Sequence, residues 1–156
     1  MKVLLVTDGS CAHETQLGSW GAVVVTATKT QRFYGMAYPT TISRCELLPI
    51  IEGLKWIYYD LCDKQPGVQV KIVSDSEYTI KTINGLYMPK KNLDLWAACK
   101  ALQAKLKIEA CWRQRNTHTY MNLCDSVAHA VRTVTMENLY EGLKDFTIPI
   151  LPMEEI

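Results

Sequence analysis

The amino-terminal segment, residues 2–10, constrains the fold of this chain more than any other stretch. Four consecutive apolar residues at positions 3–6 are followed at once by Thr7-Asp8-Gly9-Ser10. A short apolar run that is partly β-branched and bounded by turn residues is typical of a strand buried on both faces, so this segment belongs in the middle of a sheet. A carboxylate at the end of such a strand costs free energy unless backbone donors or a cation satisfy it. Asp8 therefore belongs either to a tight Asp-Gly turn or to a functional site.

Size and composition are those of one globular domain. A chain of 156 residues, of which 48% are hydrophobic, is long and apolar enough to bury a core of its own. The formal net charge of +1 points to no particular partner. The charges are unevenly spread, because residues 64–115 contain ten Lys or Arg against four Asp or Glu. This middle segment is either a surface for a polyanion or an ordinary solvated face.

The six cysteines form no Cys-x-x-Cys pair and show no metal-finger spacing. Several lie within apolar runs, which is typical of buried free thiols in a reducing compartment. No apolar run approaches the length of a membrane span, and the run at residues 3–6 is too short for the core of a signal peptide. We therefore expect a cytoplasmic protein without a membrane partner.

The pattern of apolar residues divides the rest of the chain into strands and helices. A polar loop is expected after Ser10, up to residue 19. Further strands are predicted at residues 20–26, 31–38, 68–73 and 108–112. Helices are predicted at residues 43–61, 78–87 and 92–107, and a last helix contains residues 121–131. Three antiparallel strands are thus followed by helices that alternate with two more strands.

Two more carboxylates have both a structural and a functional interpretation. Glu46 falls on the buried stripe of its helix, where either a capping box with Ser43 or a bound cation would satisfy it. Asp75 directly follows the fourth strand. If Ser74 and Glu77 form a capping box, the only role of Asp75 would be to stabilise the helix N-terminus by its negative charge. Each acid considered alone therefore has an ordinary explanation.

Four acids considered together indicate a metal site. If the strands that end in Asp8 and Asp75 are parallel neighbours, their carboxyl ends bring these two side chains together. Glu46 projects from a helix packed on the same sheet, and Asp125 lies on the last helix. Converging carboxylates repel one another, and divalent cations make such a cluster tolerable. Ligation by oxygen alone favours Mg²⁺ or Mn²⁺ over zinc.

Six motifs, taken in order, give the chain a specific resemblance. They are Thr7-Asp8-Gly9-Ser10-Cys11, Trp20-Gly21-Ala22, Thr40-Thr41-x-x-Arg44-x-Glu46-Leu47, Ser74-Asp75-Ser76-x-Tyr78, Asn92-Leu93-Asp94-Leu95-Trp96 and Cys124-Asp125-x-x-Ala128. In order, spacing and placement on strands and helices they resemble type 1 ribonuclease H over residues 2–138. Any one of these motifs alone is weak, but their succession is specific.

This resemblance implies a fold and an activity. The fold is α/β, a ribonuclease H-like five-stranded mixed sheet with three antiparallel strands and then two parallel ones, flanked by helices. Residues 1–138 form the catalytic domain. The implied activity is that of a Mg²⁺-dependent endonuclease that hydrolyses the RNA strand of RNA/DNA hybrids. Asp8, Glu46, Asp75 and Asp125 would bind two Mg²⁺ ions, with Mn²⁺ as a substitute.

The resemblance also implies contacts with the hybrid. Thr41 and Asn92 match positions that hold a phosphate of the DNA strand, and the backbone of Cys11 would lie against the RNA strand. Ser10 and Arg44 complete the predicted nucleic-acid-binding set.

A loop histidine of this family, which helps the product leave, normally lies ten residues before the last aspartate. Arg115 occupies that position here, and His118 lies seven residues before Asp125. We predict His118 for the catalytic role, because a mobile loop can shift register; the alternative is a surface histidine.

Departures from the family pattern keep other functions open. Residues 12–19 replace a glycine-rich stretch that touches the hybrid, Ile42 and Ser43 replace polar amides, and the basic helical handle is reduced to residues 85–91. One alternative is a nuclease of the same fold that acts on branched or single-stranded DNA. Another is a non-catalytic nucleic-acid-binding module, in which the acids only cap helices and shape turns. We expect a monomer, with a proline-broken tail at residues 139–156 that is either docked on the domain or bound to a protein partner.

Overall fold

The structure is a computed structural model of the chain and describes residues 1–115 and 117–133. The tail predicted at residues 139–156 lies outside the described residues. Five strands form one sheet in the order β3-β2-β1-β4-β5. Their bounds are β1 (Lys2–Ala12), β2 (Leu17–Val25), β3 (Thr30–Ala37), β4 (Gln69–Ser74) and β5 (Lys107–Trp112). The first three strands pair antiparallel, while β4 pairs parallel with β1 and with β5, which confirms the predicted mixed sheet.

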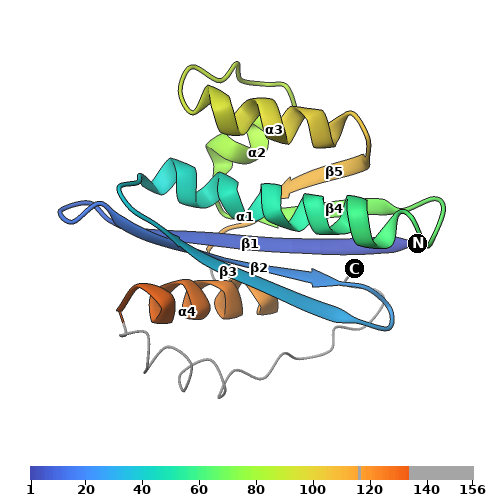
Figure 1. Cartoon of the computed structure of the whole chain (residues 1–156), viewed down its shortest axis with the longest axis horizontal. Coiled ribbons are helices and arrows are strands. Elements are labelled where there is room, and N and C mark those ends of the chain that lie inside the picture. The colour runs from blue at the N-terminus through green and yellow to red at the C-terminus, as the bar shows by residue number, and fades with distance from the viewer. Residues whose placement is uncertain (116, 134–156) are drawn as a thin grey trace.

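The helices cover the sheet on both faces (Figure 1). They are α1 (Ile42–Trp56), which continues as the π-helix η1 (Ile57–Leu61), α2 (Glu77–Ile83), α3 (Leu93–Gln103) and α4 (Thr119–Thr133). Helices α1, α2 and α3 lie on one side of the sheet, and α4 lies on the other. Within the described ranges, none of these helices is both long and apolar enough to cross a membrane.

Strand β1 is buried on both faces, as its apolar run predicts. Val3 and Leu5 belong to the core on the α1 side, whereas Leu4 and Val6 belong to the core on the α4 side. All four side chains are fully buried. Because side chains alternate along a strand, this central strand supplies both cores of the domain at once.

The predicted Asp-Gly turn and the predicted loop at residues 10–19 are wrong. Strand β1 continues through Asp8 and Gly9 to Ala12, and Ser10 pairs with Ser19 of β2. The hairpin turn lies further on, at the exposed residues 13–16. The local turn signal is overridden because β2 offers a ladder of backbone partners along the whole length of β1. The pairing with β4 ends earlier, at Val6, so Asp8 lies just beyond it, where β1 has only one neighbour.

Two glycines let helices approach the sheet closely from opposite faces. A Cβ atom at Gly9 would overlap the backbone carbonyl of Cys45 in α1. Gly21 lies opposite Asp8 in the ladder, and a Cβ atom there would lie 2.9 Å from the carbonyl oxygen of Cys124 in α4. Glycine at both positions therefore brings α1 and α4 up to the sheet beside Asp8. In each helix the residue after the contact is one of the predicted acids.

Both predicted capping boxes are corrected by the structure. Helix α1 begins earlier than expected, and Thr41 caps it, since its Oγ1 accepts a hydrogen bond from the Arg44 backbone N–H at 3.4 Å. Helix α2 begins at Glu77, and Ser76 is its N-cap. Thr and Ser at neighbouring positions have the same capping chemistry, so the residue type alone does not fix which one caps. Glu46 is thereby left without a capping role.

Candidate active site

Three of the four predicted acids converge at one edge of the sheet. Asp8 comes from β1, Glu46 from the first half of α1, and Asp75 follows the last residue of β4. One carboxylate oxygen from each lies within 4.8 Å of the others. We call these three residues the acid cluster. Parallel pairing of β1 with β4 produces this convergence, because Asp8 and Asp75 both lie just beyond the carboxyl end of the paired segments, which ends at Val6 and Val73.

Backbone contacts hold two of these acids, while the third has an unsatisfied oxygen. Asp8 Oδ1 accepts a hydrogen bond from the Gly9 N–H at 2.9 Å. The Asp75 main chain is fixed from β5, because the indole Nε1–H of Trp112 donates to its carbonyl oxygen at 3.0 Å. Glu46 Oε2 is buried and has no hydrogen-bond partner among the described residues. A buried carboxylate oxygen without a partner is costly, and it marks the place where a further group is needed.

The electrostatics of the acid cluster are those of crowded like charges. Burial, followed by the charges of Asp75 and Asp125, raises the pKa of Asp8 to about 8. Burial, followed by the charges of Asp8 and Asp75, raises the pKa of Glu46 to about 9. The pKa of Asp75 is also raised, mainly by burial. Each acid thus makes its neighbours harder to ionise, and a cation placed among them would reverse this effect.

Asp125 lies beside the acid cluster, where its charge acts on Asp8 and Glu46. Arg115, in the segment between β5 and α4, donates from Nη2 to Asp125 Oδ1 at 3.0 Å. The charges of Asp125 and Asp8 raise the pKa of Arg115. The position where the family resemblance leads one to expect a histidine therefore carries a guanidinium that is paired with the fourth acid.

The structure buries His118 at the start of α4. Its side chain is 8% exposed and lies just before α4, where Nδ1 accepts a hydrogen bond from the Tyr120 backbone N–H at 3.3 Å. His118 is therefore not a surface histidine. It contributes to the beginning of the helix that carries Asp125.

A second polar group lies at the N-termini of α1 and α3. Asn92 precedes α3 in a left-handed conformation with φ 55°, and its Oδ1 accepts from Arg44 Nη1 at 3.3 Å. Arg44 also forms a two-pronged ion pair with Asp94, at 3.0 and 2.9 Å. Thr41 lies one turn before Arg44 and is exposed. We call Thr41, Arg44, Asn92 and Asp94 the Arg44 cluster. It brings together three of the five predicted nucleic-acid-binding residues.

The other two, Ser10 and Cys11, extend β1 beyond Asp8. Both side chains are half-buried, and the Cys11 thiol lies 3.7 Å from the Thr40 carbonyl oxygen. This contact places Cys11 next to the residue that precedes Thr41. The end of β1 therefore runs from the acid cluster towards the Arg44 cluster.

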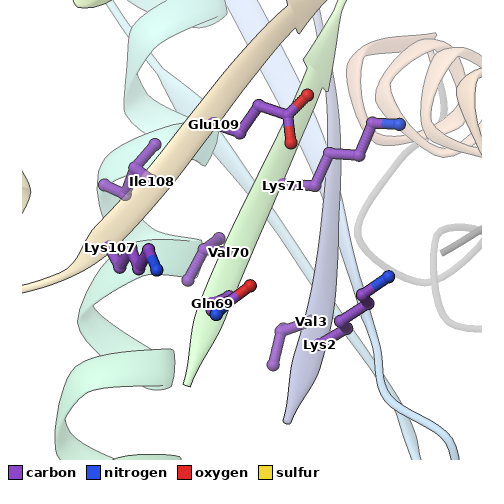
Figure 2. A pocket seen from close by; sticks show the side chains of 8 residues that line it. All are labelled: Lys2, Val3, Gln69, Val70, Lys71, Lys107, Ile108 and Glu109. Atoms are coloured by element: carbon purple, nitrogen blue, oxygen red, sulfur yellow. The ribbon is translucent and has the colours of Figure 1, made fainter. Parts of the chain in front are cut away.

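The opposite ends of the strands form a hollow of about 270 Å³, shown in Figure 2. It is lined by Lys2, Val3, Gln69, Val70, Lys71, Lys107, Ile108 and Glu109. Lys71 lies opposite Glu109 in the β4–β5 ladder, so the one acid of this lining faces a base. None of the four predicted acids lines it. The hollow is therefore separate from the acid cluster and lacks its crowding of like charges.

Comparison with known proteins decides the family. A sequence model of the RNase H family, described as RNase H, matches residues 1–132. The chain belongs to the RNase H family. The Ribonuclease H of Herminiimonas arsenicoxydans is 32% identical over 148 residues, covering 85% of this chain and 97% of that protein. The prediction of an endoribonuclease of the ribonuclease HI type is thereby confirmed.

Solved RNase H structures share the fold of the chain. The N-terminal RNase H domain of rv2228c from Mycobacterium tuberculosis superposes with a TM-score of 0.69 at 21% identity, covering 92% of this chain and 96% of that one. LC11-RNase H1, solved in complex with RNA/DNA hybrid, superposes with a TM-score of 0.67 at 16% identity, covering 78% and 92%. These two likenesses support the ribonuclease H-like sheet predicted from the sequence.

Three contacts around the candidate site of this RNase H family member could not be predicted from its sequence. Trp112 fixes the Asp75 main chain, Asp94 holds Arg44, and Arg115 pairs with Asp125. The first two depend on which strand and which helix come to lie beside each other, and no local pattern reports this. Arg115 did carry a signal, since it stands ten residues before Asp125, where the family has its loop histidine.

Proposed function

We propose that this protein is a divalent-metal-dependent endonuclease that cleaves the RNA strand of RNA/DNA hybrids. The observation that carries the proposal is the convergence of Asp8, Glu46 and Asp75, one of which, Glu46, has a buried oxygen without a hydrogen-bond partner among the described residues. Membership of the RNase H family supports the reaction class. The hybrid bound to LC11-RNase H1 supports the substrate class.

The residues of the acid cluster fit Mg²⁺, which we propose as the natural metal. They offer carboxylate oxygens alone, which hard cations such as Mg²⁺ and Mn²⁺ prefer. Burial and neighbouring acids raise the pKa values of Asp8 and Glu46, and a bound cation would offset both effects and supply a partner for Glu46 Oε2. We propose that Asp8, Glu46, Asp75 and Asp125 together hold two ions. The chemistry that a bound pair of Mg²⁺ ions supplies is activation of the attacking water and stabilisation of the leaving 3′ oxygen.

The protein's own contribution is rigid placement of the acids. Asp8 is held by the β1–β2 ladder, Glu46 by the packing of α1 against Gly9, and Asp75 by the Trp112 hydrogen bond. Side chains anchored in this way hold the ligand oxygens in place before any substrate arrives, which lowers the cost of reorganisation during the reaction.

The Arg44 cluster is the proposed site for a phosphate of the DNA strand. Thr41 offers an exposed hydroxyl, Asn92 an amide and Arg44 a guanidinium, and Asp94 holds that guanidinium in one orientation. Asp94 occupies one parallel N–H pair of Arg44, so the guanidinium would offer a phosphate its remaining N–H groups. Ser10 and Cys11, on the β1 extension between the two clusters, are proposed to contact the RNA strand.

Cleavage of a panel of substrates tests this proposal. Purified protein is given a matched hybrid, duplex RNA, duplex DNA and a branched DNA junction, each with Mg²⁺, with Mn²⁺ or with a chelator. We expect metal-dependent cleavage of the RNA strand of the hybrid. Asp63→Asn serves as a control, because this aspartate is exposed and lies outside the acid cluster. Cleavage of the junction instead of the hybrid would favour the DNA nuclease, and binding without cleavage would favour the non-catalytic module.

Residues 1–138 are proposed to be sufficient for this activity, with the protein acting as a monomer in the cytoplasm. Deleting residues 146–156 tests the role of the tail. A docked tail predicts a melting temperature several degrees lower, because apolar contacts with the domain are lost. An unchanged melting temperature would favour a segment that engages a protein partner.

A further inference from the structure

Arg115 is a basic residue whose charge acts on three acids of the proposed metal site, Asp125, Glu46 and Asp75. Its guanidinium makes one charge-assisted hydrogen bond, to Asp125 Oδ1, and 67% of its side chain is exposed. Its charge also lowers the pKa of Glu46 and of Asp75. One positively charged group thus offsets part of the repulsion that burial and crowding create among the acids.

The position of this guanidinium conflicts with metal binding by Asp125. The Oδ1 atom that accepts from Arg115 is one of the two oxygens that Asp125 can offer to a cation. A guanidinium carries a single, delocalised charge, so it leaves most of the repulsion in place, whereas Mg²⁺ is a compact divalent charge. The contact is also easy to give up, because it is single and solvent-exposed at the arginine end.

We propose that Arg115 is the built-in counter-ion of the metal-free site and that it releases Asp125 when a divalent cation binds. This inference rests on the proposed function, since it assumes that Asp125 is a metal ligand. It assigns Arg115 a positioning role: in the metal-free protein the guanidinium holds the fourth acid near the other three. The same contact sets a threshold for metal binding through Oδ1, because a cation that takes this oxygen must displace the guanidinium.

Metal affinity gives the direct test. Mg²⁺ and Mn²⁺ are titrated by calorimetry, at constant ionic strength, into metal-free wild type, Arg115→Ala and Arg113→Ala. Arg113 is a matched control, because it lies two residues away in the same exposed segment and removal of its side chain subtracts the same charge. We expect Arg115→Ala to bind metal about two- to fivefold more tightly, the range that corresponds to the loss of one exposed ion pair. We expect Arg113→Ala to bind like the wild type.

Two further measurements separate a direct contact from a general effect of charge. In an Asp125→Asn background the Arg115→Ala substitution should no longer change metal affinity, because the pair is already broken. Without metal, Arg115→Ala should lower the melting temperature, and saturating Mg²⁺ should close that gap.

The possible failures of this inference and of the proposed function differ. If the wild type binds Mg²⁺ and cleaves hybrid, but Arg115→Ala binds metal no more tightly, the counter-ion role is overturned and the proposed function stands. Equal tightening in Arg113→Ala and Arg115→Ala would also overturn it, since any nearby charge would then suffice. A wild type that binds no divalent metal would overturn both.

Discussion

The acid cluster and the Arg44 cluster use the same kinds of residue in opposite ways. In the Arg44 cluster the guanidinium binds both oxygens of Asp94 and the oxygen of Asn92, and this lowers the pKa of Asp94. In the acid cluster, burial and neighbouring charges raise the pKa of Asp8 to about 8 and that of Glu46 to about 9. The protein alone supplies hydrogen-bond and ion-pair partners for the Arg44 cluster. In the acid cluster it leaves Glu46 Oε2 without a partner among the described residues.

The proposed phosphate site and the proposed metal site thus differ in how far the protein alone satisfies their polar groups. A satisfied network keeps its geometry in isolation, so we expect the Arg44 cluster to keep its arrangement without a ligand. An unsatisfied cluster of acids is held together by the surrounding ladder and helices against its own repulsion, which is typical of sites strained for function. Substitutions in the two clusters should therefore have opposite effects on stability and unequal effects on activity.

The largest difference should appear when the same substitution is made in each cluster. Asp75→Asn removes one charged ligand oxygen with almost no change in shape, and we expect it to lower the single-turnover rate of hybrid cleavage at least about 100-fold. Asp94→Asn weakens the ion pair with Arg44 and should mainly raise the substrate concentration at which cleavage is half-maximal. The single-turnover rate of each variant is measured as a function of hybrid concentration with saturating Mg²⁺. An unchanged rate in Asp75→Asn would contradict the assignment of the acid cluster as the active site.

The second prediction concerns stability without metal, as a function of pH. The folded pKa of Asp8, about 8, lies above its ordinary value of 3.8, so the folded state holds a proton that the unfolded chain releases. This contribution to stability is fully present below about pH 4 and is lost as the pH rises through about 8. The metal-free wild type should therefore become less stable from pH 6 to pH 9, by up to roughly 1.4 kcal/mol per pH unit for each proton.

Asp8→Asn isolates this effect. At pH 9 the variant lacks the ionised carboxylate, so we expect its melting temperature to exceed that of the metal-free wild type by a few degrees, on the order of 1 kcal/mol. The gap should shrink at pH 6, and Mg²⁺ should narrow it at pH 9 by stabilising the wild type. Asp94→Asn should have the opposite sign, because it removes a favourable ion pair. A destabilised Asp8→Asn at pH 9 would show that this carboxylate has a structural role instead.

The strands of the sheet could be predicted because they follow from local patterns, whereas the grouping of the acids also depended on the family resemblance and on parallel pairing of the strands before Asp8 and Asp75. The apolar run before Asp8 predicts a central strand whatever surrounds it, and its end fixes where the acid lies. Glu46 was found from its position on a buried helical face. The helix start at Thr41 was missed because neighbouring Thr and Ser residues cap equally well. The pairing of Arg115 with Asp125 was missed because the path of the segment after β5 decides it.

The third prediction concerns the rate of multiple turnover, on which we expect substitutions at His118 and Arg115 to have a smaller effect than the substitutions of the acids. The sequence predicts that His118→Ala slows turnover and spares single-turnover cleavage, as expected for a residue that helps product leave. The geometry instead favours Arg115, which contacts Asp125, while buried His118 accepts a hydrogen bond at the start of α4. We expect the turnover defect, of several-fold, in Arg115→Ala, and a lower melting temperature in His118→Ala. A turnover defect in His118→Ala alone would restore the assignment made from the sequence.

The smallest effect should come from Arg44→Ala, because that cluster is complete and exposed. Loss of an exposed ion pair changes the free energy of unfolding only slightly, so the melting temperature should hardly move. Binding of hybrid, measured with Ca²⁺ or without metal to prevent cleavage, should weaken. The slope of log affinity against log salt should fall by about 1, because one phosphate contact is lost.

Lys55→Ala is the matched control: it removes one charge from the last turn of the same helix and breaks a surface pair with Glu52. If both variants lost the same affinity, Arg44 would contribute only net charge, and the contrast between the two clusters would not extend to substrate binding.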